Sequence, residues 1–179
     1  MKLFLQHPKL DPTNGIEGDV ALLQLENEPE LGERVKTFGL QNLAKSSKED
    51  KNIHKKKGAC IVPGYGFIKW DKFQTLLPTT MRKYSPAMLK PSVCTGGEYF
   101  KKLFLCAFNQ DLTNTCKYDG GTPLLCKSKG KTKLYGVTMG AFGFTQYCNS
   151  GQSLFTRIST YYDWIKKKTR SLQNEKIEE

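Results

Sequence analysis

The chain has 179 residues, 38% of them apolar and 25% charged, so it can bury a core as one domain or two small lobes and is not a disordered polypeptide. The formal net charge of +11 comes mainly from lysine, since the only arginines are Arg34, Arg82, Arg157 and Arg170. Proteins that read nucleic acid use arginine for bidentate contacts. We therefore expect no nucleic-acid partner, and two interpretations stay open: a solvated basic surface, or an acidic partner such as a sulfated glycan.

Two short apolar segments predict strands near the N-terminus. Residues 1–8, MKLFLQHP, predict the first strand, and DPTNG at residues 11–15 predicts a turn after it. Residues 18–27, GDVALLQLEN, are apolar almost throughout, which predicts a strand that is buried on both faces. Residues 45–58, KSSKEDKNIHKKKG, are polar and rich in lysine, so they predict an exposed loop or linker.

The C-terminal part predicts further strands. Residues 59–70, ACIVPGYGFIKW, predict a strand that runs into a Pro-Gly turn. Residues 122–128 and 131–140 predict a hairpin, with KSKGK as its turn. Residues 152–160, QSLFTRIST, predict another strand. The chain is therefore expected to be mostly β.

One helix is predicted at the C-terminal end, over residues 159–173. Ser159 or Thr160 can cap its N-terminus, because a hydroxyl accepts a hydrogen bond from a free backbone N–H of the first turn. Tyr161 and Ile165 fall on one apolar face, while the lysines that follow face water.

The cysteines indicate an oxidising compartment. They are Cys60, Cys94, Cys106, Cys116, Cys126 and Cys148. Their number is even and no C-x-x-C pair occurs, which disfavours zinc and favours three disulfides in a secreted, extracellular protein. We expect neither a metal nor a cofactor.

The N-terminus does not agree with that compartment. Residues 1–10, MKLFLQHPKL, lack the apolar run of a signal peptide, and no stretch approaches the length of a transmembrane helix, so no membrane association is expected. The simplest interpretation is a chain that lacks its front end.

Five segments resemble, in order, motifs of the trypsin-like serine proteases. They correspond to the strand with the buried acid (GDVALLQL, 18–25), a Cys-x-x-x-Gly-aromatic-Gly motif (CIVPGYG, 60–66), the nucleophile loop (CKYDGGTPLLC, 116–126), the strand lining the specificity pocket (YGVTMG, 135–140), and the closing strand with the C-terminal helix (LFTRISTYYDWI, 154–165). The resemblance extends over nearly the whole chain.

The resemblance implies a mostly β fold, the trypsin-like double β-barrel with a C-terminal helix. Residues 1–58 would form the second half of the N-terminal barrel and a lysine-rich linker, so this barrel would be incomplete. Residues 59–179 would form the C-terminal barrel and the terminal helix. Of the 15 ways to pair six cysteines, the resemblance selects Cys60–Cys126, Cys94–Cys106 and Cys116–Cys148.

The resemblance also assigns the catalytic positions. Acyl transfer in this family requires a serine nucleophile, a histidine base, an aspartate that orients the base, and backbone N–H groups for the oxyanion. The aspartate position matches Asp19, and the nucleophile position matches Gly120, which has no reactive group. The base position would lie before residue 1, and His7 and His54 are expected to be surface residues.

Two neighbours of Gly120 have implied roles as well. Tyr118 matches an oxyanion position that is usually glycine, so the ring is expected to distort or block the oxyanion hole. Asp119 matches the acid that pairs with the new N-terminal amine after zymogen cleavage, although Asp-Gly-Gly is also an ordinary tight turn.

The specificity pocket of the resemblance departs from the usual pattern. Asn114 matches the pocket base, where an acid would select lysine or arginine substrates. Thr138 and Met139 match the usual serine and tryptophan, Gly140 matches the family glycine, and Ser153 replaces a glycine that keeps the pocket open. A narrowed, neutral pocket is expected.

Three functions follow from these residues. The first is a catalytically inactive serine protease homologue that binds a protein, for example as a decoy for a protease inhibitor or substrate. The second is an active endopeptidase whose site is misaligned. The third is a polyanion-binding module that uses the loop at residues 45–57 and the helix face at residues 166–170.

Overall fold

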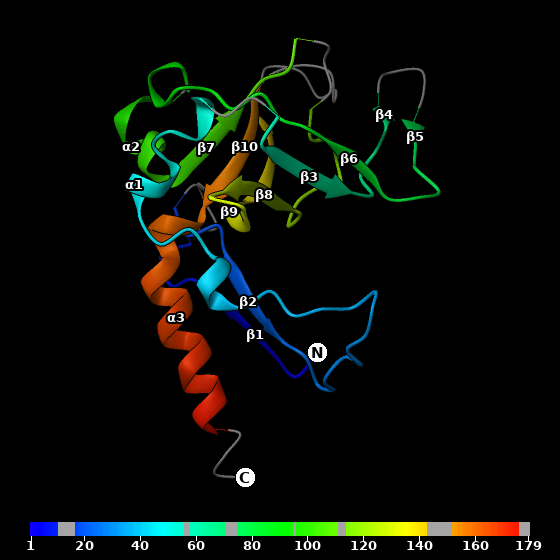
Figure 1. The fold of residues 1–179 in the computed structure, drawn as a ribbon, viewed down its shortest axis with the longest axis vertical. Coiled ribbons are helices and arrows are strands. Elements are labelled where there is room, and N and C mark those ends of the chain that lie inside the picture. The colour runs from blue at the N-terminus through cyan, green and yellow to red at the C-terminus, as the bar shows by residue number, and fades with distance from the viewer. Residues whose placement is uncertain are drawn as a thin grey trace.

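The computed structural model describes residues 1–10, 17–55, 58–70, 75–94, 96–110, 114–142 and 152–175. Its largest unit is an antiparallel sheet of six strands in the order β6–β3–β8–β9–β10–β7 (Figure 1). The strands are β3 (Cys60–Gly64), β6 (Arg82–Tyr84), β7 (Phe104–Ala107), β8 (Pro123–Ser128), β9 (Lys131–Phe142) and β10 (Gln152–Arg157). The segment that follows β6 joins the two outer strands.

That closure is made by backbone hydrogen bonds. Leu89 N donates to Cys106 O at 2.8 Å, Phe108 N donates to Ala87 O at 3.0 Å, and Met88 bridges to Ala107. The sheet therefore curls into a closed barrel, which removes the free edges that an open sheet would expose.

Two of the three disulfides expected from the resemblance are present in the barrel. Cys60 pairs with Cys126, its directly opposite residue across β3 and β8, and Cys94 pairs with Cys106 of β7. Cys116 is also disulfide-bonded, while Cys148, its expected partner, lies outside the described residues.

The β8–β9 hairpin is confirmed and the predicted Pro-Gly turn is wrong. Lys129 and Gly130 have φ values of 50° and 75°, as a two-residue hairpin turn of type I′ requires. Pro63 and Gly64, by contrast, stay within β3 and pair with β6. Because β6 offers a partner where pairing with β8 ends, the chain continues as an extended strand.

The N-terminal part forms a two-stranded antiparallel ribbon of β1 (Leu3–Gln6) and β2 (Ala21–Gln24). The prediction that the second strand is buried on both faces is wrong, because Leu23 is 60% exposed and Phe4 opposite it is 50% exposed. Within the described residues, the ribbon packs on the rest of the chain through Leu22 and the adjoining Val20. The predicted DPTNG turn lies outside the described residues.

The predicted exposed linker at residues 45–58 is partly wrong. It holds two short helical turns, α1 (Ser47–Asp50) and η2 (Ile53–Lys55), which follow η1 (Leu40–Asn42). Asp50 and Ile53 are 2% and 5% exposed. This segment is anchored because Asp50 meets Arg157 at the end of β10, at 2.9 Å.

The predicted C-terminal helix is present as α3 (Ile158–Glu175), but its predicted cap is wrong. Ser159 and Thr160 lie inside the first turn, where Ser159 Oγ donates to Asp50 Oδ2 at 2.6 Å and Thr160 Oγ1 donates to Lys102 O at 2.6 Å. The two hydroxyls therefore bind distant segments instead of the helix's own backbone.

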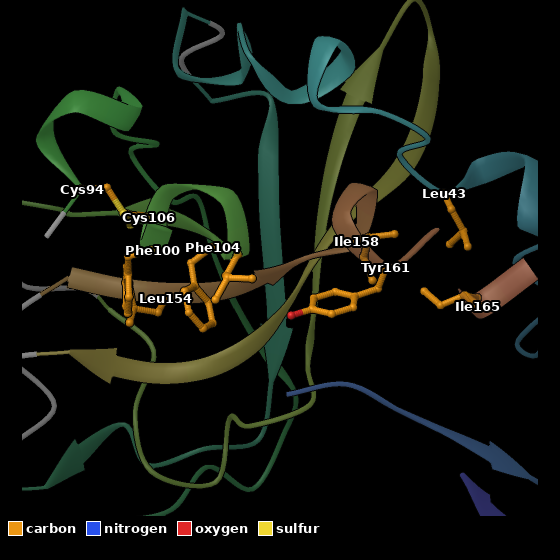
Figure 2. Packing of buried hydrophobic residues seen from close by; sticks show 10 residues of the cluster. Leu43, Cys94, Phe100, Phe104, Cys106, Leu154, Ile158, Tyr161 and Ile165 are labelled. Carbon is orange, nitrogen blue, oxygen red and sulfur yellow. A yellow bond between two sulfur atoms is a disulfide. The ribbon is translucent and has the colours of Figure 1, made fainter. Parts of the chain in front are cut away.

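The core has two clusters. One includes Leu124 and Phe155 of the barrel strands, and the other also contains residues of α3. Figure 2 shows the larger cluster, in which Tyr161 and Ile165 of α3, on the predicted apolar face, gather with Leu154 of β10 and with Phe100 and Phe104. Phe100 belongs to α2 (Gly97–Leu103), a helix that follows η3 (Pro91–Val93). A small hairpin of β4 (Lys69–Trp70) and β5 (Thr75–Leu76) projects from the barrel (Figure 1).

Candidate functional site

The loop that resembles a nucleophile loop consists of two consecutive tight turns before β8. Asp119 N donates to Cys116 O at 3.1 Å, and Thr122 N donates to Asp119 O at 3.1 Å. Tyr118 and Gly121, the third residues of the two turns, have φ values of 71° and 85°. A turn with positive φ at this position favours glycine, so the first turn carries a strained tyrosine.

The side chain of Asp119 binds the backbone on both sides of the loop. Its Oδ1 accepts from Gly66 N and its Oδ2 from Cys116 N, both at 2.9 Å. The carboxylate lies so close to Gly64 and Gly66 that a Cβ at either position would overlap it. The Gly-aromatic-Gly motif therefore leaves room for Asp119, which is held by backbone N–H groups in this structure.

Tyr118 keeps the backbone conformation of a glycine and turns its ring outward. The ring is 66% exposed and packs edge-on against Phe67, with centroids 4.9 Å apart. The family resemblance assigns the backbone N–H groups of Tyr118 and Gly120 to the oxyanion, and neither has a hydrogen-bond partner among the described residues.

Gly120 lies in open space. A Cβ built at this position meets a single atom within 4 Å, Met139 O at 3.9 Å, and the backbone angle there is not of the left-handed kind. A side chain would fit, so packing does not impose the glycine.

The hydroxyl of Thr122, two residues after Gly120, is already bonded. Thr122 Oγ1 donates to Asp119 O at 2.8 Å and lies 2.8 Å from Thr138 Oγ1. Thr138 is 3% exposed. Neither hydroxyl is therefore a free nucleophile.

Asp19 follows a tightly placed glycine. A Cβ on Gly18, which has φ 81°, would come within 2.6 Å of Leu10 N, and Gly18 N donates to Tyr161 Oη at 2.9 Å. Asp19 itself is half-buried, has no side-chain partner among the described residues, and has its pKa raised by burial.

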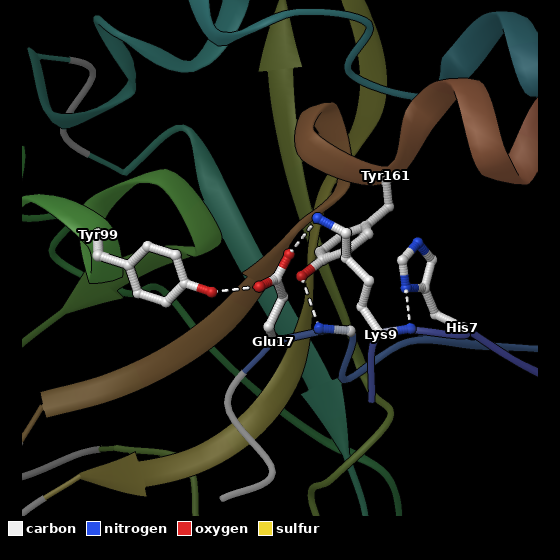
Figure 3. A network of polar contacts seen from close by, with 6 residues as sticks. His7, Lys9, Glu17, Tyr99 and Tyr161 are labelled. Atoms are coloured by element: carbon white, nitrogen blue, oxygen red, sulfur yellow. Dashed lines mark hydrogen bonds and ion pairs between the residues drawn. The ribbon is translucent and has the colours of Figure 1, made fainter. Parts of the chain in front are cut away.

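A polar network next to Asp19 connects the N-terminal segment to the barrel (Figure 3). Glu17 forms an ion pair with Lys9 at 2.8 Å and accepts a hydrogen bond from Tyr99 of α2, and these two bonds lower the pKa of its carboxyl group. His7 accepts from Lys9 N at 3.2 Å and packs edge-on against Tyr161. The network uses the histidine in packing, away from the role of a catalytic base.

The expected pocket residues divide into two groups. Ser153 and Thr138 are buried inside the barrel, at 0% and 3% exposure, while Met139 and Gly140 are half-buried on β9. Met139 packs against the larger core cluster. Asn114 accepts from Asn109 N at 3.5 Å, and its buried Nδ2 has no partner in the described part of the chain.

Two further residues surround Ser153 that the motifs did not indicate. The Ser153 hydroxyl accepts from Thr115 N at 3.0 Å and is hydrogen-bonded to the hydroxyls of Thr115 at 3.1 Å and Tyr84 at 3.3 Å. Burial is the main reason why the pKa of Tyr84 is raised. Ser153 thus belongs to a buried hydroxyl cluster, which no local sequence pattern indicates.

The comparisons with known proteins agree with this geometry. The sequence profile described as Trypsin matches residues 1–165. The chain belongs to the trypsin family. It is 29% identical to chymotrypsin-like elastase family member 1 of Macaca fascicularis over 90% of this chain and 59% of the relative, and 27% identical to kallikrein-8 of Rattus norvegicus over 91% and 58%.

The solved structures give the same answer for the fold. Mouse neuropsin, a serine protease, superimposes with a TM-score of 0.68 at 26% identity, over 93% of this chain and 70% of neuropsin. A variant of human heparin-binding protein gives the same TM-score at 24% identity and shows the fold alone. The chain spans about 60% of the length of the curated relatives it matches.

These findings establish a trypsin-family, disulfide-bonded chain with mainly β structure and a C-terminal helix. Disulfide bonding in this family is typical of secreted proteases. No helix among the described residues is long and apolar enough to cross a membrane. Within the same residues, no three potential ligand side chains gather as a metal site would require.

Proposed function

We propose that this trypsin-family chain is catalytically inactive and acts by binding a protein. The observation that carries the proposal is that Gly120, which the family resemblance matches to the nucleophile position, has space for a side chain and carries none. Without a nucleophile the acyl-enzyme step cannot begin, whatever the rest of the loop provides.

The neighbouring groups do not substitute for the missing serine. Thr122 and Thr138 are hydrogen-bonded to each other. His7 is packed against Tyr161 and Trp164 of α3, with ring centroids at 5.0 and 4.9 Å. An active endopeptidase would need a nucleophile from another position.

The surface beside the loop supports binding. Phe67 N donates to Lys117 O at 3.0 Å, so the segment after β3 is tied to the loop. Three large side chains on these two segments are exposed: Tyr65 by 59%, Ile68 by 43% and Tyr118 by 66%. Exposed aromatic residues on a braced loop are typical of protein contact sites.

The partner class follows from the preserved loop. Its turns and the Asp119 contacts keep the backbone of a nucleophile loop in place without the reactive group. A protein that recognises the active-site cleft of the family, such as a protease inhibitor or a substrate, is therefore the partner we propose, with the chain as its decoy.

A fluorophosphonate probe tests the absence of activity. We expect no labelling of the protein, with active elastase labelled in parallel as the control. Stoichiometric labelling that is abolished by heat denaturation would establish an active serine enzyme instead.

Binding is tested separately, with a panel of protein protease inhibitors measured by surface plasmon resonance. Tyr118→Ala should weaken binding by about tenfold or more, as expected for an aromatic contact residue. Leu31→Ala removes an equally exposed side chain in the N-terminal part, 61% exposed, and should leave binding unchanged. Equal affinity of both variants and the parent protein would contradict binding at the loop.

A further inference from the structure

An open pocket of about 390 Å³ lies between α1, η3, α2 and the end of β10, which are far apart in the sequence. Five of the side chains that line it are cationic: Lys48, Lys51, Lys101, Lys102 and Arg157. We call it the lysine pocket. One acidic side chain, Glu98, also lines it.

The charges of the lysine pocket are not balanced. Glu98 lies 2.6 Å from Lys101, and Asp50 lies 2.9 Å from Arg157, so each of these cations has an anionic partner. Lys48, Lys51 and Lys102 have no ion-pair or hydrogen-bond partner for their ammonium groups among the described residues. Three positive charges therefore line one pocket without an ion pair of their own, although Glu98, which already binds Lys101, also attracts Lys102 electrostatically.

Arg157 holds the two cationic helices in place. Its Nη2 donates to Lys101 O at 2.8 Å and to Phe104 O at 2.9 Å, which fixes the C-terminal end of α2. Its Nη1 pairs with Asp50, the last residue of α1. The same buried guanidinium thus binds both helices.

A second contact, made by α3, holds α1 in place. Ser159 Oγ donates to Asp50 Oδ2 at 2.6 Å, and Ile53, three residues on, is buried. Burial raises the pKa of Asp50 while Arg157 and Ser159 lower it. The backbone that carries Lys48 and Lys51 is therefore pre-organised, which reduces the entropy lost when a ligand binds.

We propose that the lysine pocket binds a sulfated saccharide of an extracellular glycan. Lysine ammonium groups are compact charges that suit tetrahedral oxyanions without demanding a planar partner. The volume lies within the range of small-molecule sites. Lys48, Lys51 and Lys102 are exposed, so a longer glycan chain can reach them from the surface. The disulfides place the protein where sulfated glycans occur.

This inference is independent of the proposed inactivity, because the pocket shares no residue with the Gly120 loop. It also differs from a general attraction of the basic chain to polyanions. Affinity from a general attraction depends on net charge alone, whereas affinity from a pocket depends on which lysines are removed.

The experiment compares two variants that lose the same charge. In the pocket variant, Lys48, Lys51 and Lys102 are replaced by Gln; in the helix variant, Lys166, Lys167 and Lys168 of α3 are replaced by Gln. Binding of a defined heparin hexasaccharide to the full chain is measured by calorimetry at several salt concentrations, with thermal melts to confirm folding.

We expect the pocket variant to lose about tenfold or more in affinity and to show a weaker salt dependence, as removal of direct charge contacts requires. The helix variant should change affinity by less than about threefold. Equal losses in both variants, or a larger loss in the helix variant, would overturn the proposal.

Three other ligands test the chemistry. A desulfated hexasaccharide should not bind. If it binds as well as the sulfated one, or if inositol hexakisphosphate or an acidic peptide binds more tightly in a manner that the pocket variant abolishes, the assignment to a sulfated saccharide is wrong.

Discussion

The closed barrel and the β1–β2 ribbon contain strands of similar apolar content but bury them very differently. In the barrel, Leu124 of β8 and Phe155 of β10 are completely buried. In the ribbon, Phe4 and Leu23 face each other across the strands and are at least half exposed. The difference lies in the covering layer: the barrel encloses its inner face, and within the described residues the ribbon has a packed neighbour on one face only (Figure 1).

This comparison shows why strand composition does not fix burial. Side chains alternate between the two faces of a strand, and each face is buried only if another element covers it. The loop at residues 116–126, which resembles a nucleophile loop, belongs to the barrel, where disulfides and the closed sheet hold it in place. Asp19 belongs to the less covered N-terminal part, which contacts α2 through Glu17 and α3 through Gly18.

The largest expected effect is a difference in the free energy of unfolding between variants of Phe155 in the barrel and Phe4 in the ribbon. Phe155→Ala should lower the free energy of unfolding by about 3–5 kcal/mol, because it leaves a cavity in a closed core. Phe4→Ala should lower it by less than about 1 kcal/mol, because half of that side chain is already in water. Urea unfolding of both variants measures the contrast.

Similar losses in the two variants would show that the exposed face of the ribbon is covered in solution. In that case sedimentation velocity would reveal whether the cover is another copy of the chain.

A second contrast concerns two adjacent acids in the segment that joins the parts. Asp50→Ala should cost about 3 kcal/mol or more, because it leaves the Arg157 guanidinium buried without its anionic partner. Glu49→Ala removes only a partly exposed ion pair with Lys133 and should cost about 0.2–1 kcal/mol. Chemical unfolding checks both values.

Equal costs for the two acids would mean that Asp50 is not the anchor of α1. Limited proteolysis between residues 45 and 58 gives an independent measurement, since release of α1 should expose this segment in the Asp50 variant alone.

The sequence predicted those features that depend on neighbouring residues. The Lys-Gly turn of the β8–β9 hairpin and the apolar face of α3 follow from local pattern, and two disulfides follow from the family motifs.

The features that sequence reasoning missed depend on partners distant in the chain. Residues 45–58 have the composition of a linker, and only the contact between Asp50 and Arg157 makes part of that segment a packed helix. Ser159 is a residue type that often caps a helix, but its hydroxyl donates a hydrogen bond to Asp50 instead. Tyr84 meets Ser153 only because the barrel closes. Local pattern carries no information about such contacts.

The smallest effect is a pH dependence that arises in the N-terminal part. Burial and then the charge of Lys9 lower the pKa of His7, which packs against Tyr161 and Trp164. In the unfolded chain the pKa is about 6.5, so on acidification the unfolded state takes up the proton first. Stability rises with pH wherever the unfolded state binds more protons, so the contribution of neutral His7 is present above about pH 6.5 and lost as the pH falls through the folded pKa.

The measurement is the urea midpoint between pH 7.5 and 5. His7→Gln should flatten its decline on the acid side, whereas His54→Gln, which removes the other histidine, should leave the decline as it is. If the decline persists unchanged in the His7 variant, the ribbon and its contact with α3 do not contribute to the cooperative unit that unfolds. The barrel and α3 alone would then determine the stability of the chain. The ribbon would differ from the barrel in burial and also in not unfolding together with it.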